Sequence, residues 1–372
     1  MTKGRVIVAG AIANKAGQGG EAWVRLNWVL GLRKLGFEVL FVEQLNSGAP
    51  ESAVTFFRET MSSAGLGDKA VLLGENGVIT GPGLPQVLDF ASGAEALINI
   101  SGHLTYAPVF ERVRRRVYVD IDPGFTQFWH AQGNAGARLD GHDFFFTIGE
   151  NIGAPDCPIP TGGIPWRTTR PPIALDHWPR VATPFDRFTT VASWRGPFGS
   201  VEFRGTTYGL KVHEFRKFIE LSSRTPGPFE LALNIHAADA KDREALERHG
   251  WRIVPPAVAS RPEDFQSYVQ QAGAEFSVAQ GIYVQTRCGW FSDRTAAFLA
   301  TGKPALVQDT GFTRHLPTSE GLLAFQSLDE AIAGAAEITA HYERHCAAAR
   351  EIAEAHFDSA KILRTLLDEI AS

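Results

Sequence analysis

The sequence predicts an α/β protein made of two doubly wound parallel-sheet domains that face a central cleft. Three observations carry this prediction. Short β-branched runs alternate with amphipathic helices up to about residue 150, a Pro- and Gly-rich segment follows at 153–187, and the alternation then resumes. With 372 residues, 44% of them hydrophobic, the chain is long enough for two cores.

The first domain is expected over residues 1–152. A helix over 20–35 follows the first strand, because Trp23, Leu26 and Leu32 recur at helical spacing and Gly36 ends the pattern. This strand–helix–strand rhythm favours a Rossmann-like, mostly parallel sheet with helices on both faces. The expected strands are Val6–Ala9, Val39–Val42, Ala96–Asn99, Val117–Ile121 and Phe144–Ile148.

Residues 153–187 contain too many Pro and Gly for regular structure and are expected to form a linker draped over the surface. A second Rossmann-like domain is expected over 188–345, and the tail over 346–372 is expected to be a helix packed between the domains. The expected strands are Thr190–Ser193, Phe229–Asn234, Arg252–Val254, Phe276–Ala279 and Ala305–Val307, and the expected helices are Lys211–Leu221, Pro262–Ala272, Thr295–Ala300 and a helical run over Leu328–Ile370.

Composition excludes several classes of protein. The net charge of −5 argues against a nucleic-acid partner, since neutralising phosphates needs a basic face. The three cysteines show no C-x-x-C spacing and fit a reducing compartment. No apolar run approaches the ~18 residues of a membrane-spanning helix, and the first residues are typical of a strand and not of a signal peptide. We expect a soluble, cytoplasmic protein without a membrane span.

The segment from Cys288 to Gly311 predicts an anion-binding helix start. Ser292 is a good N-cap for the helix that Gly302 ends, and the N–H groups of such a start are unpaired. Asp293 follows the cap, and Arg294 adds a fixed positive charge beside the start. Ser292, Asp293 and Arg294 are therefore candidate ligands of a nucleotide diphosphate.

A second candidate is Gly17-Gln-Gly-Gly20, between the first strand and the first helix. Glycines allow the backbone to approach a phosphate or a sugar, which makes Gly19 and Gly20 candidate binding residues. The spacing does not match the dinucleotide fingerprint G-x-G-x-x-G. The alternative is a flexible strand–helix turn.

A third candidate is the pair Arg195 and Lys211, which follow the first strand of the second domain and open the next helix. Arg binds phosphate as a bidentate fork and Lys as a point charge, so the pair suits a diphosphate. The alternative is that either cation is only surface-exposed. The loop between them is long enough to act as a mobile lid.

Two further candidates are acid–base groups at the carboxyl edge of the first sheet. Asp120 and Asp122, two residues apart after a strand, would share a face and could bind a metal or act as a general base. His103 follows the third expected strand and would lie at the same edge. The alternatives are that one aspartate caps the turn at Pro123-Gly124 and that His103 is structural.

Taken together, these residues resemble the GT-B glycosyltransferases, in particular the retaining group with two Rossmann-like halves. The likeness rests on four segments that span nearly the whole chain: Gly19-Gly-Glu21 with its helix and Gly36–Val39, the pair Arg195 and Lys211, the turn Ala300-Thr-Gly-Lys-Pro304, and Ser319–Leu323 with the helix behind it. In one respect the chain departs from the family. The retaining members carry two glutamates, eight positions apart, where this chain has Gly289 and Ala297.

The resemblance implies transfer of a sugar from a nucleotide-diphosphate sugar to a hydroxyl acceptor, without a metal or a further cofactor. It implies that Arg195, Lys211 and Arg294 offset the charge of the leaving diphosphate and that the acceptor lies near Gly19, Gly20 and His103. His103 or Asp122 is the expected base if the reaction inverts the anomeric centre. Two alternatives stay open: a protein of this fold that binds without transferring, motivated by the missing glutamates, and a nucleotide-sugar epimerase.

Overall fold

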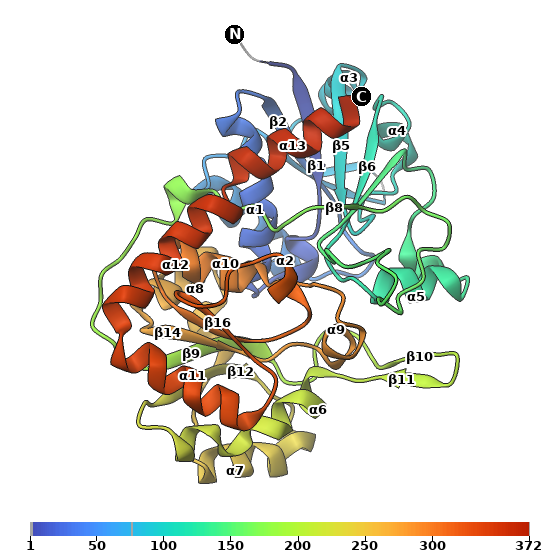
Figure 1. Ribbon diagram of the computed structural model, residues 1–372. Helices are drawn as coiled ribbons and strands as arrows, with labels where there is room; N and C mark the ends of the chain where they lie inside the picture. Colours follow the sequence, from blue (N-terminus) through green and yellow to red (C-terminus); the bar gives the residue numbers. More distant parts are fainter. Residues whose placement is uncertain (1–2, 76, 372) are drawn as a thin grey trace.

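The computed structural model describes residues 3–75 and 77–371, which fold into two α/β halves (Figure 1). The first half contains an eight-stranded sheet in the order β4-β3-β2-β1-β5-β6-β7-β8. All neighbouring strands are parallel except β3 and β4. The strands are β1 (Arg5–Ala9), β2 (Glu38–Gln44), β3 (Ala70–Gly74), β4 (Gly77–Thr80), β5 (Ala94–Ile100), β6 (Arg116–Asp120), β7 (Phe144–Thr147) and β8 (Arg167–Thr168).

Successive residues of β1 belong to two different hydrophobic clusters, as expected for a strand with helices on both faces. Val6 and Val8 pack in one cluster with the first helix, whereas Ile7 and Ala9 pack in the other. The helices of this half are α1 (Gly19–Lys34), α2 (Glu51–Ser63), α3 (Leu84–Ser92), α4 (Ala107–Phe110) and α5 (Phe125–Ala131).

The second half contains a fully parallel six-stranded sheet in the order β13-β12-β9-β14-β15-β16. Its strands are β9 (Phe188–Ser193), β12 (Phe229–Asn234), β13 (Arg252–Val254), β14 (Ala274–Ser277), β15 (Ala305–Gln308) and β16 (Leu322–Phe325). Its helices are α6 (Lys211–Phe215), α7 (Ala240–Arg248), α8 (Pro262–Gln271), α9 (Gly281–Thr286), α10 (Asp293–Ala300) and α11 (Leu328–Ala340). The predicted fold class, two Rossmann-like parallel-sheet halves, is confirmed.

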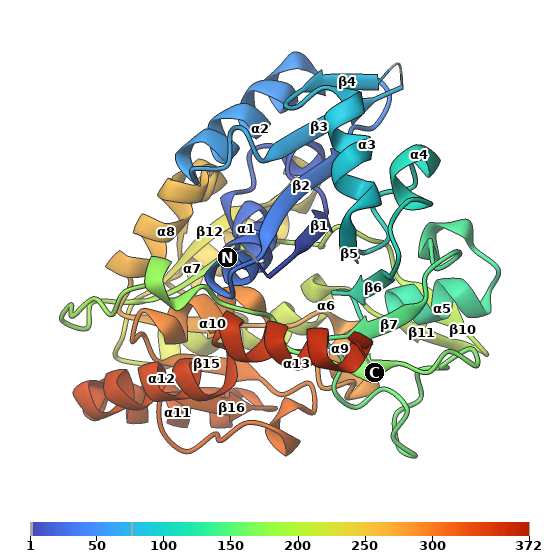
Figure 2. The ribbon, with the colours of Figure 1, turned by 90° about the horizontal axis from the view of Figure 1, so that it is seen from above.

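The tail is interrupted twice and crosses from the second half back to the first. The helical run expected over 328–370 is broken into α11, α12 (Tyr342–His356) and α13 (Ser359–Ala371). Helix α12 packs against α10, whereas α13 packs against α1 of the first half, as Figures 1 and 2 show in red. At the crossing, the N–H of Ile173 donates to the carbonyl of Phe357 (2.7 Å) and the N–H of Ser359 donates to the carbonyl of Ile173 (2.9 Å).

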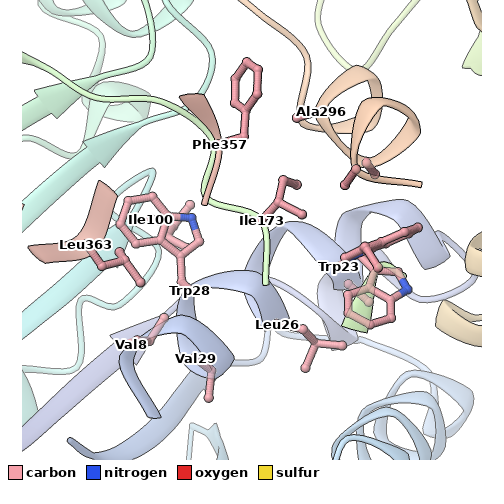
Figure 3. Packing of buried hydrophobic residues seen from close by; sticks show 14 of the residues in the cluster. Val8, Trp23, Leu26, Trp28, Val29, Ile100, Ile173, Ala296, Phe357 and Leu363 are labelled. Carbon is pink, nitrogen blue, oxygen red and sulfur yellow. The ribbon is translucent and has the colours of Figure 1, made fainter. Parts of the chain in front are cut away.

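The prediction that residues 153–187 lie draped over the surface is wrong for part of this segment. Arg167–Thr168 forms the edge strand β8, and Ile173 and Trp178 are fully buried. The Trp178 ring lies 4.8 Å from that of Trp23, between the halves. Figure 3 shows Ile173 among residues of α1, α10 and the tail. The segment therefore completes a hydrophobic core that both halves share.

The start of α1 packs against the second half without space for a side chain. A Cβ added to Gly19 would lie 2.1 Å from the carbonyl oxygen of Arg261. We expect Gly19→Ala to cost about 1–3 kcal/mol through overpacking and to lower the Tm by about 1–4 °C, measured by differential scanning calorimetry. Gly67→Ala is the matched control, because its Cβ would meet only the Cα of Ser62, at 4.0 Å. Equal Tm values for the two variants would contradict the close approach.

No helix within the described part of the chain is long and apolar enough to cross a membrane.

Candidate functional site

A cleft of about 930 Å³ lies between the two halves. The first half contributes the turns that follow β1, β5 and β6, and the second half contributes those that follow β9, β12 and β14. Both sheets thus present their carboxyl ends to one space, where ligands of open α/β sheets bind.

Gly19 and Gly20, the first residues of α1, line this cleft. The turn before them is held by a residue that sequence reasoning missed. Glu43, fully buried at the end of β2, accepts the N–H groups of Ile12 (2.8 Å) and Ala13 (2.7 Å). It also accepts the N–H and the side-chain amide of Asn14, both at 2.8 Å. Glu43 is therefore a structural anchor of the cleft wall.

His103 lines the cleft, but its environment disfavours the charged ring. The side-chain amide nitrogen of Asn14 lies 3.3 Å from its Nε2. Burial and the charges of Arg25 and Arg138 lower the pKa of His103 to about 3. The ring is neutral at pH 7 and too weakly basic to be an effective proton acceptor.

Asp120 and Asp122 are in contact, since the N–H of Asp122 donates to Oδ1 of Asp120 (3.1 Å), but only Asp122 lines the cleft, so the two carboxylates do not share one face as expected. Asp120 is fully buried and accepts three side-chain hydrogen bonds, from Thr126 (2.8 Å), Gln127 (2.8 Å) and Thr147 (2.7 Å). It anchors the turn after β6. Asp122, by contrast, lines the cleft.

Asp122 has the environment of a general base. The hydroxyl of Tyr283 donates to its Oδ1 (3.2 Å) across the interface between the halves. Burial and the charges of Glu21 and Asp120 raise the pKa of Asp122 to about 7. Its carboxylate is therefore suited to take up a proton near neutral pH.

Aromatic rings form the wall of the cleft beside Asp122. The Tyr283 ring stacks on Trp290 with a centroid distance of 4.5 Å, and both residues line the cleft. The loop over 196–210, a lid candidate, carries the hairpin β10 (Val201–Phe203) and β11 (Thr206–Tyr208). Its Tyr208 stacks on Phe128 of α5 (4.8 Å), so the loop is packed against the first half.

Arg294 lines the cleft, but its guanidinium is already occupied. Nε donates to Glu275 (2.6 Å), Nη1 to the carbonyl of Val191 (2.9 Å) and Nη2 to the hydroxyl of Ser277 (2.7 Å). Arg294 is thus a fixed positive charge at the start of α10 and not a free fork for a diphosphate.

Within the described residues, Lys211 of the second half lines the cleft with an ammonium group that is free to bind an anion. It lines the cleft at the first position of α6, and its ammonium group has no hydrogen bond or ion pair within residues 3–75 and 77–371. Burial and the charge of Arg294 lower the pKa of Lys211 to about 7. An anion placed beside it would restore the charged form.

The structure does not bring Arg195 to Lys211. Arg195 pairs with Asp239 through Nε (2.9 Å) and Nη2, is half-exposed and does not line the cleft. The partner lies 44 positions away in the sequence, so a local pattern could not reveal it.

Ser292 and Asp293 line the cleft at the start of α10, as the sequence indicated. Ser292 occupies the N-cap position, although its side chain makes no capping hydrogen bond. Burial and the charge of Glu21 raise the pKa of Asp293 to about 6. Gly289 and Ala297 do not line the cleft, and Ala297 packs in the shared core.

Sequence reasoning also missed three cations, Lys15, Arg25 and Arg138. Five basic side chains line the cleft: Lys15, Arg25, Arg138, Lys211 and Arg294. Arg25 pairs with Glu21 and Arg294 pairs with Glu275. The side chains of Lys15, Arg138 and Lys211 have no such partner in the described part of the chain. Nor does that part contain three His, Cys, Asp or Glu residues grouped to hold a metal ion.

No family model and no curated protein sequence matches the chain. Solved structures do. An alpha-glucosyltransferase in complex with UDP and DNA is 12% identical, with a TM-score of 0.63 over 99% of this chain and 100% of that one. HepE of Anabaena in complex with UDP and glucose is 10% identical, with a TM-score of 0.60 over 99% of both chains. Sucrose-phosphate synthase of Thermosynechococcus elongatus is 12% identical, with a TM-score of 0.57 over 100% of both. The chain has the GT-B glycosyltransferase fold over its whole length, which confirms the resemblance at the level of fold.

Proposed function

We propose that this protein transfers a sugar from a nucleoside-diphosphate sugar to a hydroxyl group of an acceptor. One observation carries the proposal: the cleft places an unpaired cation, Lys211, on one wall and a carboxylate with a pKa near 7, Asp122, on the other. The cation would stabilise the negative charge of the departing diphosphate, and the carboxylate would accept the proton of the attacking hydroxyl. The structural neighbours, which contain UDP, support uridine diphosphate as the first nucleotide to test.

We infer that the second half holds the donor. Lys211 would contact the diphosphate as a point charge, and the N–H groups at the start of α10 would add donors beside Ser292 and Asp293. Arg294 would contribute through its fixed charge, because its donors are already occupied. A role for Arg195 would require breaking its pair with Asp239.

We propose Asp122 as the general base of an inverting reaction, in preference to His103. The acceptor oxygen would attack the anomeric carbon while the carbon–oxygen bond to the diphosphate breaks. The bonding electron pair leaves with the diphosphate, and the hydroxyl proton passes to Asp122. Closure around the reacting atoms would exclude water, which protects the donor from hydrolysis.

Tyr283 supports this base across the interface. We expect Tyr283→Phe, which keeps the ring stacked on Trp290, to remove the hydrogen bond that lowers the pKa of Asp122. The acidic limb of the kcat–pH profile should then move to higher pH. An unchanged limb in a variant with wild-type Tm would contradict this role.

We also propose that side-chain cations make a divalent metal unnecessary. Activity measured after dialysis against EDTA should equal activity with added Mg²⁺ or Mn²⁺, because Lys211, Lys15 and Arg138 can offset the phosphate charges of the bound substrates. A rate that falls with EDTA and returns with Mg²⁺ would contradict metal independence.

The proposal is tested by incubating the protein with a panel of nucleoside-diphosphate sugars, with and without hydroxyl acceptors, and following release of the nucleotide. Release that needs Lys211 supports transfer or donor hydrolysis. Binding without release supports a binding protein, the alternative that the absence of acidic residues at Gly289 and Ala297 favours. Conversion of the donor sugar without an acceptor would indicate an epimerase.

A further inference from the structure

Two of the three unpaired cations lie on the wall that faces Lys211. Lys15 lies in the turn before α1, and Arg138 lies in the turn that follows α5. Both charges act on the ring of His103, which places them around the same part of the first half. The charged neighbours of Lys211 are different ones, all from the second half. The cleft therefore has two separate positive regions.

The backbone at this wall adopts an uncommon conformation. In the described part of the chain, four residues other than Gly have a positive φ, and two of them, Ser101 (φ 55°) and Arg138 (φ 51°), line the cleft. Residues with a Cβ disfavour this region, and such conformations persist where the surroundings hold them, often at binding sites.

Close packing holds both turns in place. A Cβ on Gly102 would lie 2.6 Å from the carbonyl oxygen of Arg138, so the turns after β5 and α5 meet at a glycine. The hydroxyl of Tyr118 donates to the carbonyl of Ala137 (2.9 Å) and fixes the residue before Arg138. The fold thus packs Gly102, the neighbour of Ser101, directly against Arg138 at the rim of the cleft.

The Lys15 charge acts on Glu21 and Asp122, but within the described residues no carboxylate of this wall forms an ion pair with Lys15 or Arg138. Glu43 is satisfied by the backbone N–H groups of the β1–α1 turn, and Glu21 pairs with Arg25. Asp122 accepts the hydroxyl of Tyr283 and belongs to the reacting centre. The side-chain donors of Lys15 and Arg138 are therefore left for a ligand.

We propose that the acceptor carries an anionic group, a monophosphate or a carboxylate, which binds between Lys15 and Arg138 while its hydroxyl faces Asp122. This inference rests on the proposed function. Arginine offers a planar fork to either anion, lysine adds a point charge, and Ser101 adds a hydroxyl to the same edge. The anion stays unchanged in the reaction, and its binding energy positions the hydroxyl that loses its proton to Asp122.

The first test measures binding and needs no catalysis. With the donor site saturated by uridine diphosphate, inorganic phosphate at ~10 mM in a chloride buffer of matched ionic strength should raise the Tm of the wild-type protein. Arg138→Gly and Lys15→Ala should abolish this rise. Glycine suits the positive φ at 138, so the first variant removes the charge without straining the turn.

Arg204→Gly is the matched control. Arg204 is exposed at the hairpin turn, has the same left-handed backbone (φ 49°) and lies outside the cleft lining, so its loss should leave the phosphate effect unchanged. The inference is wrong if neither phosphate nor acetate at the same concentration raises the wild-type Tm, or if the rise is equal in Arg138→Gly. It is also wrong if uridine diphosphate abolishes the effect, because the cations then belong to the donor site.

The second test measures transfer to matched acceptors: a hexose, its 6-phosphate and its uronate. Arg138→Gly should raise the KM for the preferred anionic acceptor by about 10-fold to 100-fold, and that for the neutral hexose by less than about twofold. Preference for the phosphate or for the uronate identifies the anion. A specific phosphate effect in a protein that transfers no sugar would leave the anion site standing and overturn the proposed function instead. Equal KM changes for neutral and anionic acceptors would overturn the anion site.

Discussion

Asp122→Asn is expected to lower kcat by about 10²- to 10⁴-fold, the usual contribution of a general base. The amide keeps the shape of the side chain and can still accept the hydrogen bond from Tyr283. The wild-type kcat should rise with pH up to about 7, because Asp122 must be deprotonated to accept the proton and its pKa is raised to about 7. The residual activity of the variant should lack this dependence.

The same substitution should stabilise the protein above pH 7. The folded-state pKa of Asp122 lies above its unfolded value, so the folded state binds more protons between the two values and loses stability as pH rises through that window. Asparagine removes this cost, so the Tm of the variant should exceed that of the wild type at pH 8 and match it near pH 3. Burial raises the pKa of Asp120 as well, but Asp120→Asn is the control and should lower the Tm, because each carboxylate oxygen accepts a side-chain donor and the new amide nitrogen would face one of them. A kcat within a few-fold of wild type for Asp122→Asn would contradict the base and favour a retaining reaction.

Lys211→Met is expected to raise the Kd for the nucleoside diphosphate by about 10-fold to 100-fold, since a hydrogen bond to a charged group contributes about 1.5–3 kcal/mol. Methionine keeps the unbranched side chain and removes the charge. Because the pKa of Lys211 is lowered to about 7, wild-type affinity should fall as pH rises above 7, and that of the variant should not. Isothermal titration calorimetry measures both, and wild-type binding just above pH 7, where much of the free Lys211 is deprotonated, should be accompanied by proton uptake.

Arg195→Ala is the matched control for Lys211→Met. The guanidinium of Arg195 pairs with Asp239 outside the cleft. The Kd of Arg195→Ala for the nucleoside diphosphate should therefore stay within about threefold of the wild-type value. A large loss of affinity in Arg195→Ala with none in Lys211→Met would show that the sequence identified the better residue and that Arg195 leaves Asp239 when the donor binds.

The two titrations oppose each other. Transfer needs Asp122 without its proton and Lys211 with its proton, yet both have a pKa of about 7 in the empty cleft. A bound diphosphate favours the protonated form of Lys211, which raises its pKa and separates the two values. The pH interval over which kcat stays high should therefore be wider than the interval over which kcat/KM stays high.

The sequence predicted the central strands because buried parallel strands are near-continuous apolar runs, as Arg5–Ala9 and Ala305–Gln308 illustrate. The sequence did not predict the short strands β8, β10 and β11. β8 has two residues, and the hairpin β10–β11 has strands of three, too short to produce a pattern. The linker was misjudged because its prolines suggested a surface loop, whereas Ile173 and Trp178 are buried by contacts that are distant in sequence.

Site residues could be predicted where they directly follow a strand or open a helix. Asp122, His103, Lys211 and Asp293 all line the cleft for this reason. Arg138 lies in a turn without a local signal, and only the packing of Gly102 against it brings it to the rim. The occupied guanidinium of Arg294 depends on Glu275 and Ser277, which the fold and not the local sequence places beside it.

The double crossing between the halves has a mechanical consequence. The linker and the tail run side by side and are hydrogen-bonded to each other at Ile173, so the halves are joined by a paired hinge and not by a single flexible strand. A rotation of one half relative to the other about this hinge would keep the hydrogen bonds between the linker and the tail intact. It would pull the β10–β11 hairpin away from Phe128, the ring on which Tyr208 stacks.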